Sequence, residues 1–152
     1  MRGKQSDQKN EVKVMIRTFA LVLGIVYIIA GIAGFIPALT PHSADMQPLS
    51  VEMAHGKALG LFPVNVLHNL VHIIVGALGI LGSRSLSGAR FFWKGLAVFY
   101  GLLAILGMIP ATNTTFGLIP IYGHDVWLHA GTALVAAYFG FIARPAEESR
   151  AV

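Results

Sequence analysis

Four long apolar runs dominate the chain, and most polar residues lie between them. The runs cover approximately residues 17–36, 64–82, 91–109 and 126–143. Each run is close to the ~20 residues that an α-helix needs to cross ~30 Å of hydrocarbon. Backbone groups in lipid must be hydrogen-bonded within the spanning structure, so we expect helices rather than strands. The first run is too long for the apolar part of a typical signal peptide, and we expect it to remain as a membrane anchor.

The composition agrees with a membrane protein. Of the 152 residues, 55% are hydrophobic and only 12% are charged, which is too apolar for an ordinary soluble domain. The chain has no cysteine, which excludes disulfides, iron–sulfur clusters and thiolate zinc sites. The sequence therefore predicts one membrane domain, residues 17–143. It is preceded by a polar N-terminal segment, 1–16, that we expect to be disordered, and followed by a short tail, 144–152.

Lysine and arginine are distributed unevenly among the polar segments. One set of segments carries Arg2, Lys4, Lys9, Lys13, Arg17, Arg84, Arg90, Lys94, Arg144 and Arg150, and the opposite set carries only Lys57. The positive-inside rule then places both termini and the middle loop in the cytoplasm. The formal net charge of +4 is explained by this topology and by anionic lipid headgroups, so nucleic acid is not expected as a partner.

The chain also contains an internal repeat. The segment "GIVYIIAGIAGFIP" (24–37) matches "AVFYGLLAILGMIP" (97–110), and "GLFPVNVLHNLVH" (60–72) matches "GLIPIYGHDVWLH" (117–129). Each copy, about 17–82 and 91–143, contains two spans and returns to its starting side of the membrane. The two copies must then be parallel and related by a pseudo-two-fold axis along the membrane normal. The predicted fold is an all-α integral membrane protein, with four transmembrane helices built from two helix-hairpin repeats.

Two of the predicted helices carry polar residues on one face. In the second run, His68 and His72 are four residues apart and Asn65 and Asn69 lie beside them; in the fourth run, Asp125 and His129 have the same spacing. Residues four apart share one face of a helix. A polar face within a membrane is expected to point into the bundle rather than toward lipid. By the repeat, His72 is equivalent to His129.

The four residues His68, His72, Asp125 and His129 admit three interpretations. The first is structural, with the imidazoles hydrogen-bonded across helices to groups such as Tyr27 or Tyr100. The second is ligand binding: a haem or chlorophyll held between His72 and His129, or a divalent metal held by all four residues, since imidazole and carboxylate are common metal ligands. The third is a proton or ion relay, because histidine titrates near neutral pH.

The long segment between the first two runs, residues 37–63, has a different character. It contains four prolines, and within it "SVEMAHGKALG" (50–60) is compatible with a short interfacial helix. His42, Glu52 and His55 lie in this segment, and we expect them to be solvated loop residues.

The segments "RTFALVLGIVYIIAGIAGFIP", "GLFPVNVLHNLVHIIVGALGI" and "GLIPIYGHDVWLHAGTAL" together resemble an uncharacterised bacterial membrane family, domain of unknown function 4383. The resemblance extends over nearly the whole chain, from about residue 17 to 143. It implies four membrane helices and a place in a bacterial cytoplasmic or internal membrane. It implies no established activity and provides no catalytic residues.

The sequence does not predict an enzyme. It has no serine–histidine motif, phosphate-binding loop or pair of carboxylates in a plausible site. We therefore expect a small integral membrane protein that acts as a structural or accessory subunit of a larger membrane complex, or as a homo-oligomer, with the lipid bilayer as its surroundings. The alternative is binding of haem, chlorophyll or metal through His72 and His129.

Overall fold

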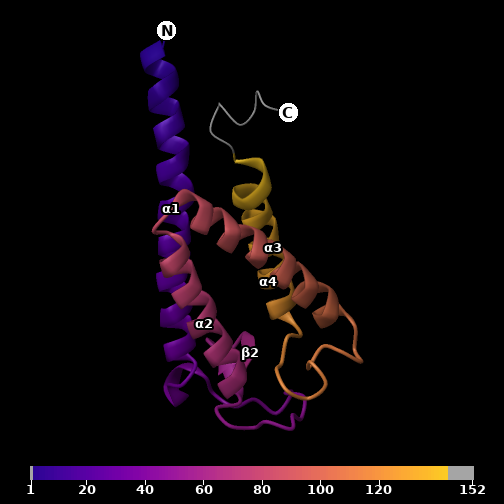
Figure 1. Cartoon of the computed structure of the whole chain (residues 1–152). Helices are drawn as coiled ribbons and strands as arrows, with labels where there is room; N and C mark the ends of the chain where they lie inside the picture. Colours follow the sequence, from indigo (N-terminus) through magenta and orange to yellow (C-terminus); the bar gives the residue numbers. More distant parts are fainter. Residues whose placement is uncertain (1, 144–152) are drawn as a thin grey trace.

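The computed structural model describes residues 2–143 as two helix hairpins. The first pairs α1 (Arg2–Ala33) with α2 (Val66–Gly82), and the second pairs α3 (Leu86–Met108) with α4 (His124–Ala137), which continues into the π-helical segment η2 (Tyr138–Ile142). Figure 1 shows α1 and α2 side by side, with the long connections 34–65 and 109–123 at the same end of the molecule. The predicted tail, 144–152, lies outside the described residues.

Three stretches of helix are long and apolar enough to cross a membrane: Asp7–Ala33, Leu86–Met108 and His124–Ile142. The fourth helix, α2, is also apolar but has only 17 residues. Large apolar side chains point outward along these helices; Val98 on α3 is 69% exposed and Leu134 on α4 is 73% exposed. The mostly helical, membrane-type fold expected from the sequence is therefore confirmed.

Local signals explain where the helices begin and end. Asn65 caps α2, because its side chain accepts a hydrogen bond from the backbone N–H of His68 at 3.0 Å. Ser85 caps α3 in the same way through Gly88. At the C-terminal ends, α1 stops a few residues before Pro37 and α3 stops just before Pro110. Proline disfavours the helical conformation of the residue that precedes it, so helices usually end there.

The start of α1 differs from the sequence prediction. The helix begins at Arg2 and includes most of the 1–16 segment, for which disorder was expected. This segment contains no proline, and its lysines and glutamines favour helix, so it extends a helix that the apolar run has already nucleated. Figure 1 shows its first turns projecting beyond the rest of the bundle.

The helices within the first hairpin touch through their backbones. A Cβ atom added to Gly76 would lie 2.6 Å from the Gly24 carbonyl oxygen, and one added to Gly24 would lie 2.7 Å from the Gly76 carbonyl oxygen. Near the far end of the hairpin, Gly34 packs against the side chain of Asn69. Small residues thus allow close approach where lipid provides no hydrophobic driving force between helices.

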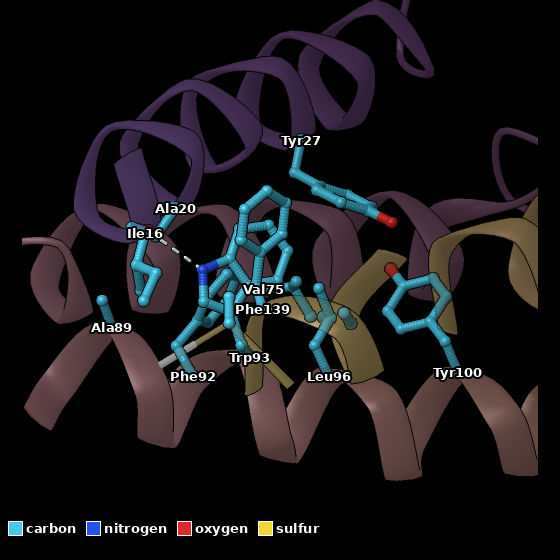
Figure 2. Packing of buried hydrophobic residues seen from close by; sticks show 12 residues of the cluster. Ile16, Ala20, Tyr27, Val75, Ala89, Phe92, Trp93, Leu96, Tyr100 and Phe139 are labelled. Carbon is cyan, nitrogen blue, oxygen red and sulfur yellow. Dashed lines mark hydrogen bonds between the residues drawn. The ribbon is translucent and has the colours of Figure 1, made fainter. Parts of the chain in front are cut away.

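The core between the hairpins is aromatic. Trp93 is 1% exposed, and its indole Nε1–H donates to the Ile16 carbonyl of α1 at 3.0 Å (Figure 2). Its ring also packs on Phe139, with centroids 4.9 Å apart. Farther along, the hydroxyls of Tyr27 and Tyr100 point toward each other across the bundle (Figure 2). Trp93 therefore connects α3 to both α1 and η2, and Tyr100 makes a second contact between α3 and α1.

Arginines close the helix ends opposite the long connections. Arg17 of α1 donates from Nε to the Ser83 carbonyl at 2.8 Å and from its terminal nitrogen to the Arg84 carbonyl at 3.1 Å. Arg90 of α3 donates to the Ala143 carbonyl at 3.1 Å, after the last turn of η2. The last carbonyls of a helix lack intrahelical partners, so both arginines satisfy carbonyl groups that the helices themselves leave unpaired.

The long connection contains a small β-hairpin rather than the expected interfacial helix. Strand β1 (Gly56–Ala58) pairs antiparallel with β2 (Phe62–Val64), with Lys57 opposite Pro63. The turn between them places Leu59 and Gly60 at φ values of 52° and 72°, which do not fit a continuing right-handed helix. The prediction of a helix over residues 50–60 is therefore wrong.

The expectation that the loop histidines are all solvated is wrong for His55. Its side chain is 3% exposed, and Nδ1 lies 2.6 Å from a carboxylate oxygen of Glu52. The pKa of Glu52 is held below its ordinary value, first by a hydrogen bond from the Leu49 backbone N–H and then by His55. His42 packs edge-on to His55, with ring centroids 6.0 Å apart.

A second charged pair fixes the other side of this loop. Lys57 Nζ lies 2.5 Å from Asp45 Oδ2, and the Ser43 hydroxyl also bonds to Asp45. The bonds from Lys57 and then Ser43 lower the pKa of Asp45 from its ordinary 3.8 to about 2.

Candidate functional site

The polar residues predicted to face the interior gather where α2 and α4 begin. His68 belongs to the first turn of α2, Asp125 to the first turn of α4 and His129 to the next turn of α4. Their exposed fractions are 3%, 1% and 1%. Each is therefore withdrawn from both lipid and water, as expected for ionisable residues in a membrane protein.

The three side chains converge on one point. His129 Nε2 lies 3.4 Å from Asp125 Oδ2, and His68 Nε2 lies 4.0 Å from the same oxygen. One ligand atom from each residue lies within 4.8 Å of the others. Both separations exceed the 2.7–3.2 Å usual for an N–H···O hydrogen bond, and Asp125 Oδ2 has no hydrogen-bond partner.

His72 is adjacent to this cluster but does not belong to it. It is half-buried, and it contacts the cluster through its ring, with its centroid 4.6 Å from that of His68. The geometry thus brings together three of the four residues suggested by the sequence, and it pairs His129 with His68 rather than with His72.

The cluster is part of a closed ring of five aromatic side chains. Tyr27 packs on His72 at 5.1 Å, His72 on His68 at 4.6 Å and His68 on His129 at 6.2 Å. His129 packs on Tyr100 at 5.0 Å, and Tyr100 packs back on Tyr27 at 5.7 Å. All four helices contribute to this ring, so it links the two hairpins at the depth of the site.

Two asparagines secure the region around the cluster. The Asn65 side-chain amide donates to the Val51 carbonyl at 2.9 Å and to the Leu118 carbonyl at 2.7 Å, which ties both long connections together above the site. Asn69 is fully buried against Gly34, and neither end of its amide has a hydrogen-bond partner. The sequence placed both asparagines on the interior face, but it gave no sign of the two loop carbonyls.

A small cavity adjoins the imidazoles. Its volume is about 40 Å³, and its lining includes His68, His72, His129, Tyr100 and Thr115. Pockets for drug-sized ligands measure ~300–1,000 Å³. A haem or chlorophyll would therefore require the helices to separate, whereas a metal ion or a few water molecules fit the space as it is.

Comparison with known proteins identifies the family. The family described as "Domain of unknown function (DUF4383)" matches residues 17–142. The chain belongs to this family. Comparison with curated proteins and with solved structures found no match. Membership of DUF4383 agrees with the resemblance seen in the sequence, and it assigns no activity, so function has to be argued from the site and the surface.

Proposed function

We propose that this DUF4383 protein is a non-enzymatic structural or accessory subunit of a membrane assembly, built as a pseudo-symmetric bundle of four transmembrane helices. In this proposal α2 crosses the membrane with the three longer helices, and both termini are cytoplasmic, as the distribution of lysine and arginine favours. The observation that carries the proposal is a pair of apolar grooves on opposite seams of the bundle.

The first groove lies between α2 and α3 and the second between α1 and α4. Their volumes are about 360 and 380 Å³, and nearly all of their surface is apolar. The first is lined by residues that include Val75, Leu78, Phe92, Leu96 and Phe99, and the second by Thr132, Val135, Phe19, Leu23 and Val26. These two lists correspond one to one under the sequence repeat. An apolar helix from a partner subunit, or from a second copy, would fit against either groove by side-chain packing.

Equivalent turns support the internal symmetry. Leu59 and Phe116, which correspond under the repeat, have φ values of 52° and 60°. The glycines that follow them, Gly60 and Gly117, have φ values of 72° and 86°. Few non-glycine residues adopt such φ values, so their recurrence at matching positions favours a duplicated hairpin unit.

Equivalent contacts support it as well. The rings of Tyr27 and His72 lie 5.1 Å apart at 71°, and those of Tyr100 and His129 lie 5.0 Å apart at 77°. Arg17 and Arg90 also occupy equivalent positions in the repeat, and each donates to a carbonyl at the end of the other helix of its own hairpin. The contact between Tyr27 and Tyr100 joins a residue to its own counterpart, which is what a two-fold axis through that point requires.

Cross-linking tests the subunit role. Because the chain has no cysteine, each introduced cysteine is unique. We expect Leu78→Cys and Val22→Cys, one in each groove, to cross-link to another polypeptide in native membranes. Val98→Cys, on an exposed face of α3 outside both grooves, is the matched control. Mass spectrometry of the adducts distinguishes a second copy from a different protein. Equal, background-level cross-linking at all three positions would show that lipid alone fills the grooves.

The orientation has its own test. Ala44 lies in the long connection after α1, and Ser87 lies at the start of α3; both are exposed. We expect Ala44→Cys to react with an impermeant maleimide from outside the cell and Ser87→Cys to react only after the cells are opened. The reverse pattern would overturn the proposed topology.

A further inference from the structure

The separations within the His68–Asp125–His129 cluster match those between ligands of one metal ion. Two ligands ~2.1 Å from a tetrahedral zinc ion lie about 3.4 Å from each other. The distance from His129 Nε2 to Asp125 Oδ2 is 3.4 Å, and that from His68 Nε2 is 4.0 Å. A shift of about 0.6 Å (4.0 − 3.4 Å) would bring His68 Nε2 to the same distance, and one ligand atom from each residue already lies within 4.8 Å of the others.

Hydrogen bonding does not explain the same arrangement. Asp125 Oδ2 is buried and unpartnered although two imidazoles face it, because neither approaches closely enough to donate a hydrogen bond. A buried carboxylate without compensation is expensive in an apolar setting. A cation between the three groups would compensate it, and this is independent of any role in a larger assembly.

We propose that His68, Asp125 and His129 bind one divalent transition-metal ion, with two imidazole nitrogens and one carboxylate oxygen as ligands. The fourth ligand would be a water molecule, for which the adjoining cavity of about 40 Å³ has room. His72 is not a ligand; it contacts the cluster only through its ring, which lies edge-on to that of His68 with centroids 4.6 Å apart.

The chemistry of the ligands indicates the class of metal. Imidazole suits zinc, copper, iron and nickel, whereas magnesium and calcium prefer sites made entirely of oxygen. The ion would join α2 to α4 and therefore one hairpin to the other.

Zinc binding by the full-length chain in detergent tests the proposal. The protein is treated with a chelator, dialysed against zinc with a weak competing chelator, and its metal content is measured. We expect one zinc ion per wild-type chain. Asp125→Asn and His129→Gln should each weaken binding at least tenfold, the lower end of the ~10–100-fold losses seen even when only groups supporting a ligand are changed. Helical circular dichroism and a single elution peak establish that each variant is folded.

Two controls make the assignment specific. His124→Gln changes the exposed residue beside Asp125, and His72→Phe keeps an aromatic ring beside His68; both should retain one zinc ion per chain. Cobalt(II) bound to the wild type should give the visible spectrum of a tetrahedral ion with nitrogen and oxygen ligands. A metal-free wild type that Asp125→Asn stabilises would overturn the proposal in favour of a packing role. Loss of zinc in His72→Phe would overturn the three-ligand set, and unchanged binding in Asp125→Asn would overturn the site.

Discussion

At the scale of single residues, two side chains make contacts that join separate parts of the fold. Trp93 is the clearest in the core, since it fills space between three helices and also donates a hydrogen bond to Ile16. Asp45 is the clearest example in the long connection, since its carboxylate accepts hydrogen bonds from both Lys57 and Ser43. Both lead to predictions that compare a substitution with a matched control.

Trp93→Phe should destabilise the folded protein by about 1–3 kcal/mol, through the lost hydrogen bond to Ile16 and the smaller ring. The chain has one other tryptophan, Trp127, which is 71% exposed. Trp127→Phe should therefore change stability by no more than ~0.5 kcal/mol. Denaturant unfolding in detergent, followed by circular dichroism, measures both. Equal effects of the two substitutions would contradict the packing described for Trp93.

Acid should loosen the long connection through Asp45. The pKa of Asp45 is lowered from 3.8 to about 2, so the contribution of its carboxylate to the stability of the loop is fully present above about pH 4. That contribution disappears as the pH falls toward 2. Asp45→Asn should therefore speed hydrogen exchange at the Lys57 amide at neutral pH, and the difference from wild type should vanish near pH 2. Asp7→Asn, on α1, is the control and should leave Lys57 unchanged; a mutant difference that persists at pH 2 would refute the assignment.

At the scale of elements, the hairpins depend on glycines at particular crossings. Gly76→Ala would bring a methyl group 2.6 Å from the Gly24 carbonyl oxygen, so α1 and α2 would have to separate. We expect a loss of about 1–3 kcal/mol, typical of overpacking. Gly95→Ala, in α3, meets nothing within 4 Å and should be neutral or slightly stabilising, since alanine favours helix by ~1 kcal/mol. Thermal unfolding in detergent compares the two, and equal midpoints would count against backbone contact.

The sequence predicted the helices well because their signals are local. Apolar runs, the Asn65 cap and the prolines after α1 and α3 act within a few residues. Apart from the earlier start of α1, the observed bounds lie close to those expected. The β-hairpin was missed because strands of three residues depend on remote partners, such as the Pro41 carbonyl that accepts from the Lys57 amide. In the same way, helical spacing placed His68, His72, Asp125 and His129 on interior faces. It did not show which three converge, because that depends on how α2 and α4 are rotated and shifted against each other.

At the scale of the whole molecule, the proposed two-fold axis relates the two halves of the site. The two halves differ at one position, where the first hairpin has a histidine and the second an aspartate. His68 corresponds to Asp125 and His72 to His129 under the repeat, so each hairpin contributes one pair of residues four apart. Exchange of the two unlike residues should then produce the same set of ligands on the opposite side of the axis, with His72 taking the place of His129.

Zinc binding by exchanged variants tests this symmetry. His68→Asp alone and Asp125→His alone should each weaken zinc binding at least tenfold. In metal sites, even the loss of a group that only supports a ligand lowers the affinity ~10–100-fold. The double variant should recover most of the affinity. Circular dichroism confirms that all three variants are folded, and a double variant no better than either single one would argue against the axis.

The shortness of α2 has a mechanical consequence for the membrane around the protein. At ~1.5 Å per residue, its 17 residues measure about 25 Å, while hydrocarbon is ~30 Å thick. Its neighbour α3, with 23 residues, would extend to about 35 Å. If both helices cross the bilayer, lipid beside α2 must compress while lipid beside α3 does not. A second short helix beside α2 would replace part of this compressed lipid and so lower the cost of the deformation. Hydrophobic mismatch alone would therefore favour association at the α2 side of the protein, in addition to any contact between side chains.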